Sequence, residues 1–397
     1  MKKKRINAAG RIVLLSTTLF CLLFFTSCKQ EKNNSKTQIS QNPQKDYFPE
    51  KLNVKYATGF KVAYFGNYKV LKIINPYKNS SDTLTYVLTQ KGTPRPSGYE
   101  DAQFVEIPIQ TFACVYTPHV AFADILESTD IIKGFASPEY IINPFVKKGL
   151  KEGTITYIGQ PDDLNQETLL SLNPQALMIS GVTISDLTRY KMLIESGISV
   201  LVNSEWREKN PLGRAEWLKM LALFLNKETL ANEKFRQIEE EYLKLKKLTE
   251  DIENRPNIIT GLSYKDAWFI PGGRSFMSHL IKDAGATYPW VTDSTTASFP
   301  LSFEAVYAKG LKADFWLNPE YASSKKDLIN VDARLADFKA YKSGRVYNHY
   351  NRTKENGANE YWESGVLNPH VVLADLIKIF HPELLPKHKL YYYKQLK

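Results

Sequence analysis

Cysteine is scarce in this chain. Its 397 residues include 3 cysteines. Cys21 and Cys28 lie within and directly after an N-terminal leader, described below, so Cys114 would have no partner for an intramolecular disulfide. A single remaining cysteine also excludes a zinc site built from cysteines, because such a site needs several thiolates.

Histidine ligands for a bare zinc or manganese ion are also too few. Direct coordination would need about three histidines and a carboxylate brought together. Of the 6 histidines, His119 and His349 follow candidate strands, His279 lies within a predicted helix, and the others are in the C-terminal tail. We therefore expect no metal site, and a protein for bare zinc or manganese is kept as an alternative.

Motifs of the common enzyme classes are missing. The chain has no Gly-x-Ser-x-Gly and no glycine-rich phosphate loop before a basic helix. Cys114 lies inside an apolar strand, where a free cysteine is usually an inert core residue. Pro271-Gly272-Gly273-Arg274 could cradle an oxyanion or phosphate, but a strand-to-helix turn needs such residues for geometry alone. We expect no enzymatic activity, with an extracytoplasmic enzyme as the alternative class.

Long hydrophobic runs are limited to one segment at the N-terminus. Ile12 to Phe25 is 14 residues long and is preceded by five basic and no acidic residues. A helix of that length spans about 21 Å, which is short of the roughly 30 Å hydrocarbon core of a bilayer. Residues 1–27 are therefore predicted to be a signal peptide and not a membrane anchor.

The residues that end this leader are Phe25-Thr26-Ser27-Cys28. They resemble the lipobox at which bacterial lipoproteins are cut and acylated on the cysteine. The resemblance implies that Cys28 carries a lipid, and the alternative is an ordinary cleaved signal with an incidental cysteine. Residues 28–46 are polar and lack apolar residues almost completely, which is typical of a disordered tether.

The basic net charge is partly a property of the leader. Removal of residues 1–27 lowers the formal charge from +10 to +5. The remaining lysines and arginines form no dense stripe interleaved with aromatic residues, so we expect no nucleic-acid partner.

Strands and helices alternate along the mature chain. Short β-rich runs fill residues 60–90, with a hairpin turn at Gly66-Asn67. Candidate strands at 112–115, 131–134, 176–179 and 198–202 are then separated by helical patterns, which favours a parallel sheet covered by helices. Apolar residues at helical spacing mark two helices between Trp217 and Ile252, and strands resume at 257–260, 314–317 and 345–347. The pattern predicts an α/β lobe, a helical middle and a second α/β lobe.

The two predicted lobes are internally similar. Leu164-Asn165-Gln166-Glu167 opens a helix that leads to the strand at 176–179, and Leu301-Ser302-Phe303-Glu304 opens one that leads to the strand at 314–317. Two similar α/β lobes that face each other form a cleft at the carboxyl ends of their strands, where ligands bind.

The chain resembles the substrate-binding lipoproteins of ATP-driven importers for iron complexes and cobalamin. Weak motifs match in family order over roughly residues 105–390, among them Pro271 to Ser275, the Ser302-Phe303-Glu304 block and Ser343 to Tyr347. The resemblance implies two α/β lobes joined by a long helix. The corresponding boundaries are 47–207 for the N-terminal lobe with its extra β-rich segment, 208–227 for the connecting helix and 228–397 for the C-terminal lobe. Gln175, where the family usually has an acid, and the extra segment depart from the family pattern.

The resemblance implies a protein that captures a metal chelate. A ferric siderophore is the expected ligand, with cobalamin or haem as alternatives, and the metal would arrive inside the ligand without a resident cofactor. Such chelates call for aromatic surfaces and cationic donors. The candidates at predicted strand ends are Arg95, Tyr116, Tyr140, Trp268, Arg274, Trp290, Arg352, Tyr361 and Trp362. We expect about half of the aromatic residues among them to be core residues instead.

The resemblance also implies the partners. In this family one glutamate on each lobe docks into arginines of the ABC permease dimer, which assigns that role to Glu167 and Glu304; a structural alternative is that both stabilise helix N-termini. We expect a monomer that faces the periplasm and is anchored by its lipid to a bacterial membrane.

Overall fold

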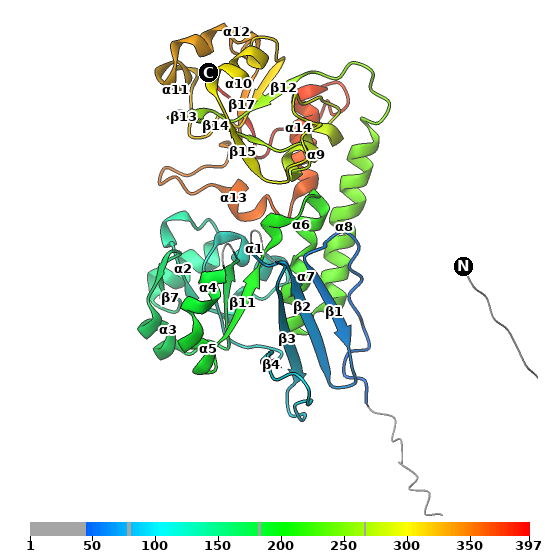
Figure 1. Ribbon diagram of the computed structural model, residues 1–397, viewed down its shortest axis with the longest axis vertical. Helices are drawn as coiled ribbons and strands as arrows, with labels where there is room; N and C mark the ends of the chain where they lie inside the picture. Colours follow the sequence, from blue (N-terminus) through cyan, green and yellow to red (C-terminus); the bar gives the residue numbers. More distant parts are fainter. Residues whose placement is uncertain (1–44, 78–80, 182–183, 266) are drawn as a thin grey trace, which may run out of the picture. The chain divides into compact units, whose positions relative to one another are not determined.

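The computed structural model describes residues 45–77, 81–181, 184–265 and 267–397. The predicted signal peptide, Cys28 and residues 28–44 of the predicted tether lie outside this range. Lys45–Lys397 form one compact unit, in which two α/β lobes lie at either end of a set of long helices (Figure 1).

The first lobe is built on a five-stranded parallel sheet, as the alternation of strands and helices predicts. Its strand order is β11-β10-β5-β6-β7. The strands are β5 (Phe112–Cys114), β6 (Ile132–Phe135), β7 (Thr156–Tyr157), β10 (Ala176–Ser180) and β11 (Ser199–Asn203). Cys114 is free and fully buried, which confirms its assignment to the core. The helices of this lobe are α1 (Thr117–Ile125), α2 (Pro144–Glu152), α3 (Gln166–Leu172), α4 (Ile184–Arg189) and α5 (Lys191–Glu195). A small separate sheet pairs β8 (Gly159–Gln160) with β9 (Asp163–Leu164).

The extra β-rich segment forms its own four-stranded sheet beside this lobe. It contains β1 (Phe60–Tyr64), β2 (Tyr68–Ile74), β3 (Thr83–Gln90) and β4 (Gln103–Ile107), in that order. The turn between β1 and β2 is the predicted hairpin, closed by the Phe65 amide donating to the Tyr68 carbonyl. Tyr86 of β3 packs edge-on against Phe224, so the sheet is anchored on the central helices.

Three helices join the lobes. They are α6 (Pro211–Glu216), α7 (Leu218–Leu225) and α8 (Glu228–Lys247). We predicted a single connecting helix at 208–227. The structure has two shorter helices there, α6 and α7, and the connection continues beyond residue 227 into α8. Asn226 takes a left-handed conformation at the end of α7 (φ 54°), which ends that helix. The chain then continues into α8, whose 20 residues span about 30 Å and pack against both α7 and α14 of the second lobe.

The second lobe has two sheets. One has the order β12-β16-β17-β18 and the other β13-β14-β15. Their strands are β12 (Ile258–Thr260), β13 (Ser263–Tyr264), β14 (Ala267–Pro271), β15 (Ser298–Leu301), β16 (Phe315–Leu317), β17 (Val346–Asn348) and β18 (Lys394–Gln395). Its helices are α9 (Phe276–Asp283), α10 (Phe303–Gly310), α11 (Lys325–Val331), α12 (Lys339–Lys342), α13 (Glu360–Ser364) and α14 (Pro369–Phe380).

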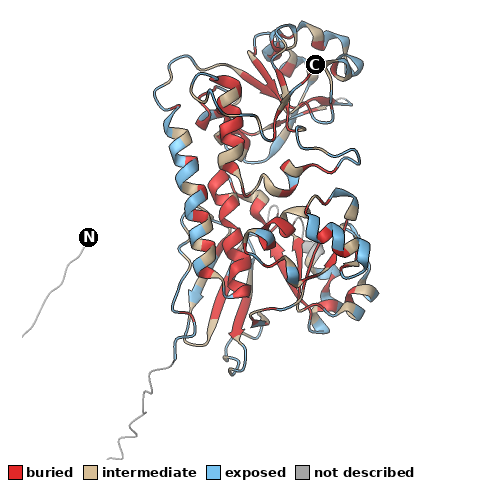
Figure 2. Ribbon diagram, turned by 180° about the vertical axis from the view of Figure 1, so that it is seen from behind, coloured by how far each residue is buried: buried red, intermediate tan, exposed pale blue. Residues whose placement is uncertain are grey.

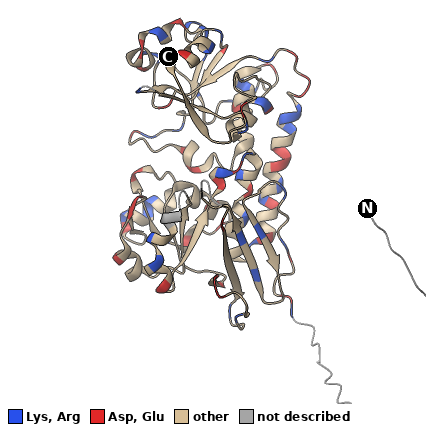
Figure 3. Ribbon diagram, in the orientation of Figure 1, with Lys and Arg blue, Asp and Glu red and all other residues tan. Residues whose placement is uncertain are grey.

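Burial and charge follow this arrangement. Figure 2 shows that α8 presents an exposed face to solvent while much of the neighbouring helical surface is buried. In the view of Figure 3, basic and acidic residues are interspersed over both lobes. Among the residues that the structure describes, no helix combines the length and the apolar composition that a membrane span requires.

Candidate functional site

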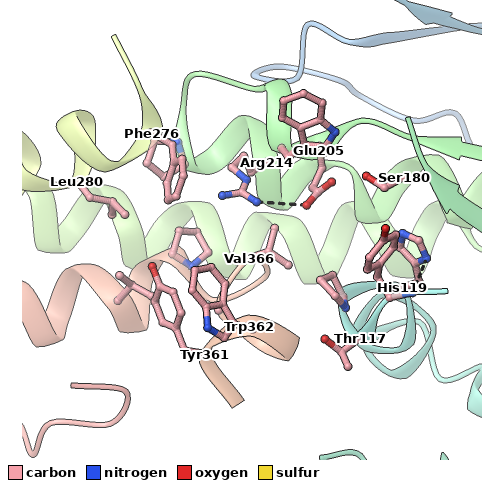
Figure 4. A pocket seen from close by; sticks show the side chains of 17 residues that line it. Thr117, His119, Ser180, Glu205, Arg214, Phe276, Leu280, Tyr361, Trp362 and Val366 are labelled. Carbon is pink, nitrogen blue, oxygen red and sulfur yellow. Dashed lines mark hydrogen bonds and ion pairs between the residues drawn. The ribbon is translucent and has the colours of Figure 1, made fainter. Parts of the chain in front are cut away.

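A cavity of about 330 Å³ lies between the two lobes, beside the connecting helices (Figure 4). Its volume is at the lower end of the range of ligand pockets. The first lobe contributes residues at the carboxyl ends of β5 and β10, α6 contributes Pro211 and Arg214, and the second lobe contributes α9, α13 and the start of α14. The lining residues are Tyr116, Thr117, Pro118, His119, Ser180, Glu205, Trp206, Pro211, Arg214, Phe276, Leu280, Tyr361, Trp362, Gly365, Val366, Pro369 and Val372.

Local structure places these side chains at the cavity. Tyr116 is the N-cap of α1, directly after β5, so the end of a parallel strand delivers it to the cleft. On the opposite lobe, the Asn359 side chain accepts a hydrogen bond from the Tyr361 amide and thereby starts α13. This short helix presents Tyr361 and Trp362 side by side, with ring centroids 5.1 Å apart at 79°. The cavity therefore has aromatic residues on two sides.

Arg214 is the cationic group of the cavity. One terminal nitrogen of its guanidinium lies 3.2 Å from a carboxylate oxygen of Glu205, and both side chains are largely buried. The guanidinium also lies over the ring of Phe276, 4.3 Å from its centroid. Figure 4 shows this group facing the space above Trp362.

Two buried donors in the lining have no acceptor within the part of the chain that the structure describes. They are Nε of Arg214 and Nε1 of Trp206. Buried N–H groups are nearly always paired, because an unpaired one costs about 1–3 kcal/mol. An oxygen acceptor from a ligand would satisfy them.

The cavity histidine is not arranged as a metal ligand. His119 is 1% exposed, and burial lowers its pKa to about 3, so the ring is neutral. Its Nδ1 faces the backbone amide of Tyr116 at 3.5 Å. His349, the other histidine that follows a predicted strand, is also buried, packs on Tyr361 and is outside the lining. Across the described residues there is no group of three or more His, Cys, Asp or Glu side chains placed to hold a metal ion.

Some of the nine predicted ligand residues meet in the cavity. Tyr116, Tyr361 and Trp362 line it, and their contact with a ligand stays a prediction. The prediction that Trp268 faces the ligand needs correction, because Trp268 is fully buried in the core of the second lobe and its Nε1 donates to the carbonyl of Thr260. Trp290 is partly buried, packs edge-on against Tyr288 and is not in the lining.

The other predicted residues lie outside the cavity. Tyr140 is 54% exposed at the end of a short 3-10 helix, Pro138–Tyr140, that precedes α2. Arg95 is exposed beside Phe104, and Arg274 is exposed before α9. Arg352 pairs with Glu360 and lies over the ring of Tyr391. A position near a strand end was too coarse a criterion, because these four residues follow strands and yet do not line the cavity.

Sequence reasoning missed Arg214, Glu205, Trp206 and Phe276. A signal for Arg214 was present: it lies three residues before Trp217 and seven before Leu221, at the spacing of the apolar stripe that begins at Trp217. A charged residue on an apolar helical face needs a partner, and Glu205 supplies it.

The Pro271-Gly272-Gly273-Arg274 segment has a structural role. A Cβ on Gly272 would meet Thr295 at 2.2 Å, and one on Gly273 would meet backbone oxygens of residues 290–293 at about 2.5 Å. The Gly272 and Arg274 amides are bonded to the carbonyls of Ala297 and Thr295. The glycines therefore allow a close backbone approach.

Glu167 and Glu304 occupy equivalent positions in the two lobes. Each is the second residue of its helix, α3 or α10, and each is exposed. The capping acceptors are the neighbouring side chains of Asn165 and Ser302. Capping by the glutamates themselves is therefore not needed, and their role in docking stays a prediction.

Comparison with known proteins agrees with this architecture. Two uncharacterized lipoproteins of Methanocaldococcus jannaschii are 24% and 25% identical to this chain, and the alignments cover 98% and 97% of it and 96% and 99% of the relatives. A possible iron-binding periplasmic solute-binding protein from Staphylococcus epidermidis has a similar structure, with a TM-score of 0.52 and 15% identity over 68% of this chain and 98% of that one. A periplasmic heme-binding protein from Pseudomonas aeruginosa also has a TM-score of 0.52, with 16% identity over 69% of this chain and 94% of that one.

The sequence model of a family described as periplasmic binding protein matches residues 136–352, which is more than half of the chain. This match includes β10, β11, the connecting helices and the part of the second lobe that precedes α13. It confirms the family that the sequence resembles and the fold of two α/β lobes. The chain belongs to the periplasmic binding protein family, whose members are extracytoplasmic solute-binding proteins of ABC importers.

Proposed function

We propose that this protein captures a ferric siderophore or a similar anionic metal chelate and delivers it to an ABC permease. The observation that carries the proposal is the composition of the interlobe cavity. Tyr116 and Trp362 provide aromatic surface against which the organic part of a chelate can pack, with Tyr361 buried behind Trp362, and Arg214 provides a cation with an unpaired N–H. Oxygen-rich chelates of iron carry hydrogen-bond acceptors that could pair with the unpaired N–H groups of Arg214 and Trp206.

The cavity favours an anionic chelate over a corrinoid or haem. Arginine binds carboxylate and catecholate oxygens through forked hydrogen bonds, whereas the amide groups of a corrinoid gain less from a cation. Haem would call for an axial ligand; the ring of His119 is turned to the Tyr116 amide, so a tyrosine of the lining, Tyr116 or Tyr361, would have to take that role. Two proteins of similar structure are named a possible iron-binding protein and a heme-binding protein, so a ligand that contains iron is consistent with these names.

Purification from native membranes tests the proposal directly. The protein is expected to carry iron, and its absorption spectrum is expected to show the charge-transfer band of a ferric chelate. A Soret band would instead identify haem, and a cobalt-containing corrinoid spectrum would identify cobalamin. Purified protein with no metal chelate, combined with turnover of a small substrate, would favour the enzyme alternative.

Trp362→Ala is expected to weaken chelate binding by about ten- to a hundredfold. Trp362 is 59% exposed at the cavity, so a ligand would cover much of its ring. Loss of that buried area and of stacking corresponds to about 1.5–3 kcal/mol. The measurement is a titration that follows tryptophan fluorescence of the wild type and ligand absorbance for the variant. Tyr264→Ala is the matched control, because Tyr264 is 58% exposed outside the cavity. Equal affinity of both variants and the wild type would exclude Trp362 from the site.

Cys28→Ser is expected to release the protein from membranes without a change in ligand affinity. The lipobox-like residues before Cys28 motivate this prediction, and the lipoprotein names of the full-length relatives support it. A single acylated cysteine would be the anchor. Membrane fractionation of wild type and variant, followed by ligand titration of both, makes the comparison. A Cys28→Ser variant that still sediments with membranes would contradict the lipid assignment.

A further inference from the structure

The end of the extra β sheet that points away from the cavity carries exposed aromatic side chains. The start of β1 lies against the central helices, where the Gly59 amide donates to Glu208 at 2.8 Å. At about 3.3 Å per residue, the strand then runs about 17 Å to the turn at Phe65. We call this end of the sheet the aromatic end and define it by Tyr47, Phe65, Tyr68 and Tyr99.

The rings of the aromatic end are fixed on the sheet and are partly open to solvent. Phe65 is 41% exposed and Tyr47 is 38% exposed. Phe65 stacks on Tyr68 with ring centroids 4.5 Å apart, and Tyr99 packs edge-on against Tyr68 at 6.0 Å. The Tyr47 amide donates to the Gly66 carbonyl at 2.9 Å, which holds Tyr47 beside the turn. These side chains therefore form one ordered apolar surface at the tip of the sheet.

Charges of both signs surround the aromatic end. Lys45 and Lys91 are exposed, and residues 100–101, both acidic, are exposed in the loop before β4. Asp46 pairs with Lys51 at 2.8 Å. Mixed charge gives little net attraction to an anionic surface, whereas aromatic rings with an apolar body and a polar edge suit the boundary between lipid headgroups and hydrocarbon.

The aromatic end is also the part of the fold that lies nearest to Cys28 along the chain. Tyr47 is among the first residues that the structure describes, and the turn between β1 and β2 lies at the same end of the molecule (Figure 1). Tyr47 is 19 residues after Cys28, so a lipid on Cys28 would keep it within about 65 Å of the bilayer even in a fully extended chain. Such a tether makes contact with the bilayer effectively intramolecular, so a small contact surface is sufficient.

We propose that the aromatic end rests on the lipid bilayer, with Tyr47 and Phe65 inserted among the headgroups. This inference goes beyond the capture of a chelate and rests on the predicted lipid at Cys28, not on the ligand. It concerns the tethered protein when it is not docked on a permease. Contact through this end gives the protein one preferred orientation, in which β1 directs α6 and the cavity away from the bilayer.

A fluorescent label at position 91 tests this contact. The lipidated Lys91→Cys protein is labelled with an environment-sensitive fluorophore and reconstituted into phosphatidylcholine vesicles; Cys114 is fully buried and is not expected to react. The vesicle-bound protein should show stronger and blue-shifted emission, compared with the unlipidated Cys28→Ser form mixed with the same vesicles. High salt should leave this shift in place, because aromatic insertion and not charge is the source of the contact.

Two matched variants separate contact of the aromatic end from attachment by the lipid. Tyr47→Ser with Phe65→Ser should stay on the vesicles through its lipid but lose the shift at position 91. Tyr264→Cys places the label on the second lobe, at a side chain that is 58% exposed, and should show no shift.

Several outcomes would overturn the proposal. One is unshifted emission at position 91 in vesicle-bound protein, and another is an equal shift in the Tyr47→Ser, Phe65→Ser variant. A shift that appears without vesicles and grows with protein concentration would show that a second copy of the chain covers this surface instead. Protein that does not float with vesicles would contradict both the lipid assignment and the contact. None of these measurements uses a chelate, so failure of the proposed function would leave them unaffected.

Discussion

Uptake of the chelate is expected to fall to background when Glu167 and Glu304 are both changed to lysine. Each glutamate is exposed at the second position of a helix, one on each lobe. Two charges on one rigid molecule define an orientation that one patch cannot define, and charges at the rim of an interface mainly steer association. If they dock into permease arginines, reversal places like charges opposite one another, which costs several kcal/mol.

The double variant should keep its fold and its ligand affinity. Glu304 has a long contact with Arg334, 3.9 Å between exposed groups, and such a surface pair contributes about 0–1 kcal/mol. The experiment compares radiolabelled chelate uptake by cells with chelate binding by the purified variant. Glu152→Lys with Glu253→Lys changes the net charge equally at exposed positions away from these helices and should leave uptake intact. Normal uptake by the Glu167→Lys, Glu304→Lys variant would refute docking and leave both residues a role at helix N-termini.

Replacement of Arg214 is expected to weaken binding of an anionic chelate by about ten- to a hundredfold. A hydrogen bond to a charged group contributes about 1.5–3 kcal/mol, and the free Nε of Arg214 is the donor in question. Removal of the arginine alone would leave Glu205 without its partner in a largely buried site. The test therefore uses Arg214→Met together with Glu205→Gln, and thermal unfolding checks that this variant is folded.

Glu205→Gln alone gives the opposite expectation. It removes the carboxylate that neutralises Arg214, so an anionic chelate should bind at least as tightly as to the wild type. Isothermal titration with one ferric siderophore and a neutral analogue of similar size measures both effects. Wild-type affinity in the Arg214→Met, Glu205→Gln variant would show that the arginine is structural and that the ligand is recognised elsewhere.

The strands and helices were predictable because they depend on local patterns. The strands at 112–115, 176–179 and 198–202 correspond to β5, β10 and β11, and the hairpin at Gly66-Asn67 is present. Helical spacing from Trp217 onward marked the central helices. Their lengths were harder to predict, because a left-handed Asn226 ends one helix and leaves α8 to span the lobes.

The cavity was predictable only in part. Tyr116, Tyr361 and Trp362 follow strand ends or open a short helix, and they line the cavity, while their contact with a ligand stays a prediction. Trp268 has the same residue type and a similar place in the sequence, yet it packs on Trp316 and Phe338 in the core. An aromatic side chain suits a core and a stacking surface equally well, so its identity does not distinguish the two.

The sequence by itself determined the family, the α/β lobes and the equivalence of Glu167 and Glu304, because these depend on residue order and periodicity. Only the tertiary structure decided which charged groups share the cleft. Glu205, which follows β11, pairs with Arg214 of α6 in the cavity lining, and Glu363 of α13 accepts a hydrogen bond from Ile142 of the first lobe. The pairing of a buried charge depends on which distant segment reaches it in three dimensions, and no local pattern encodes that contact.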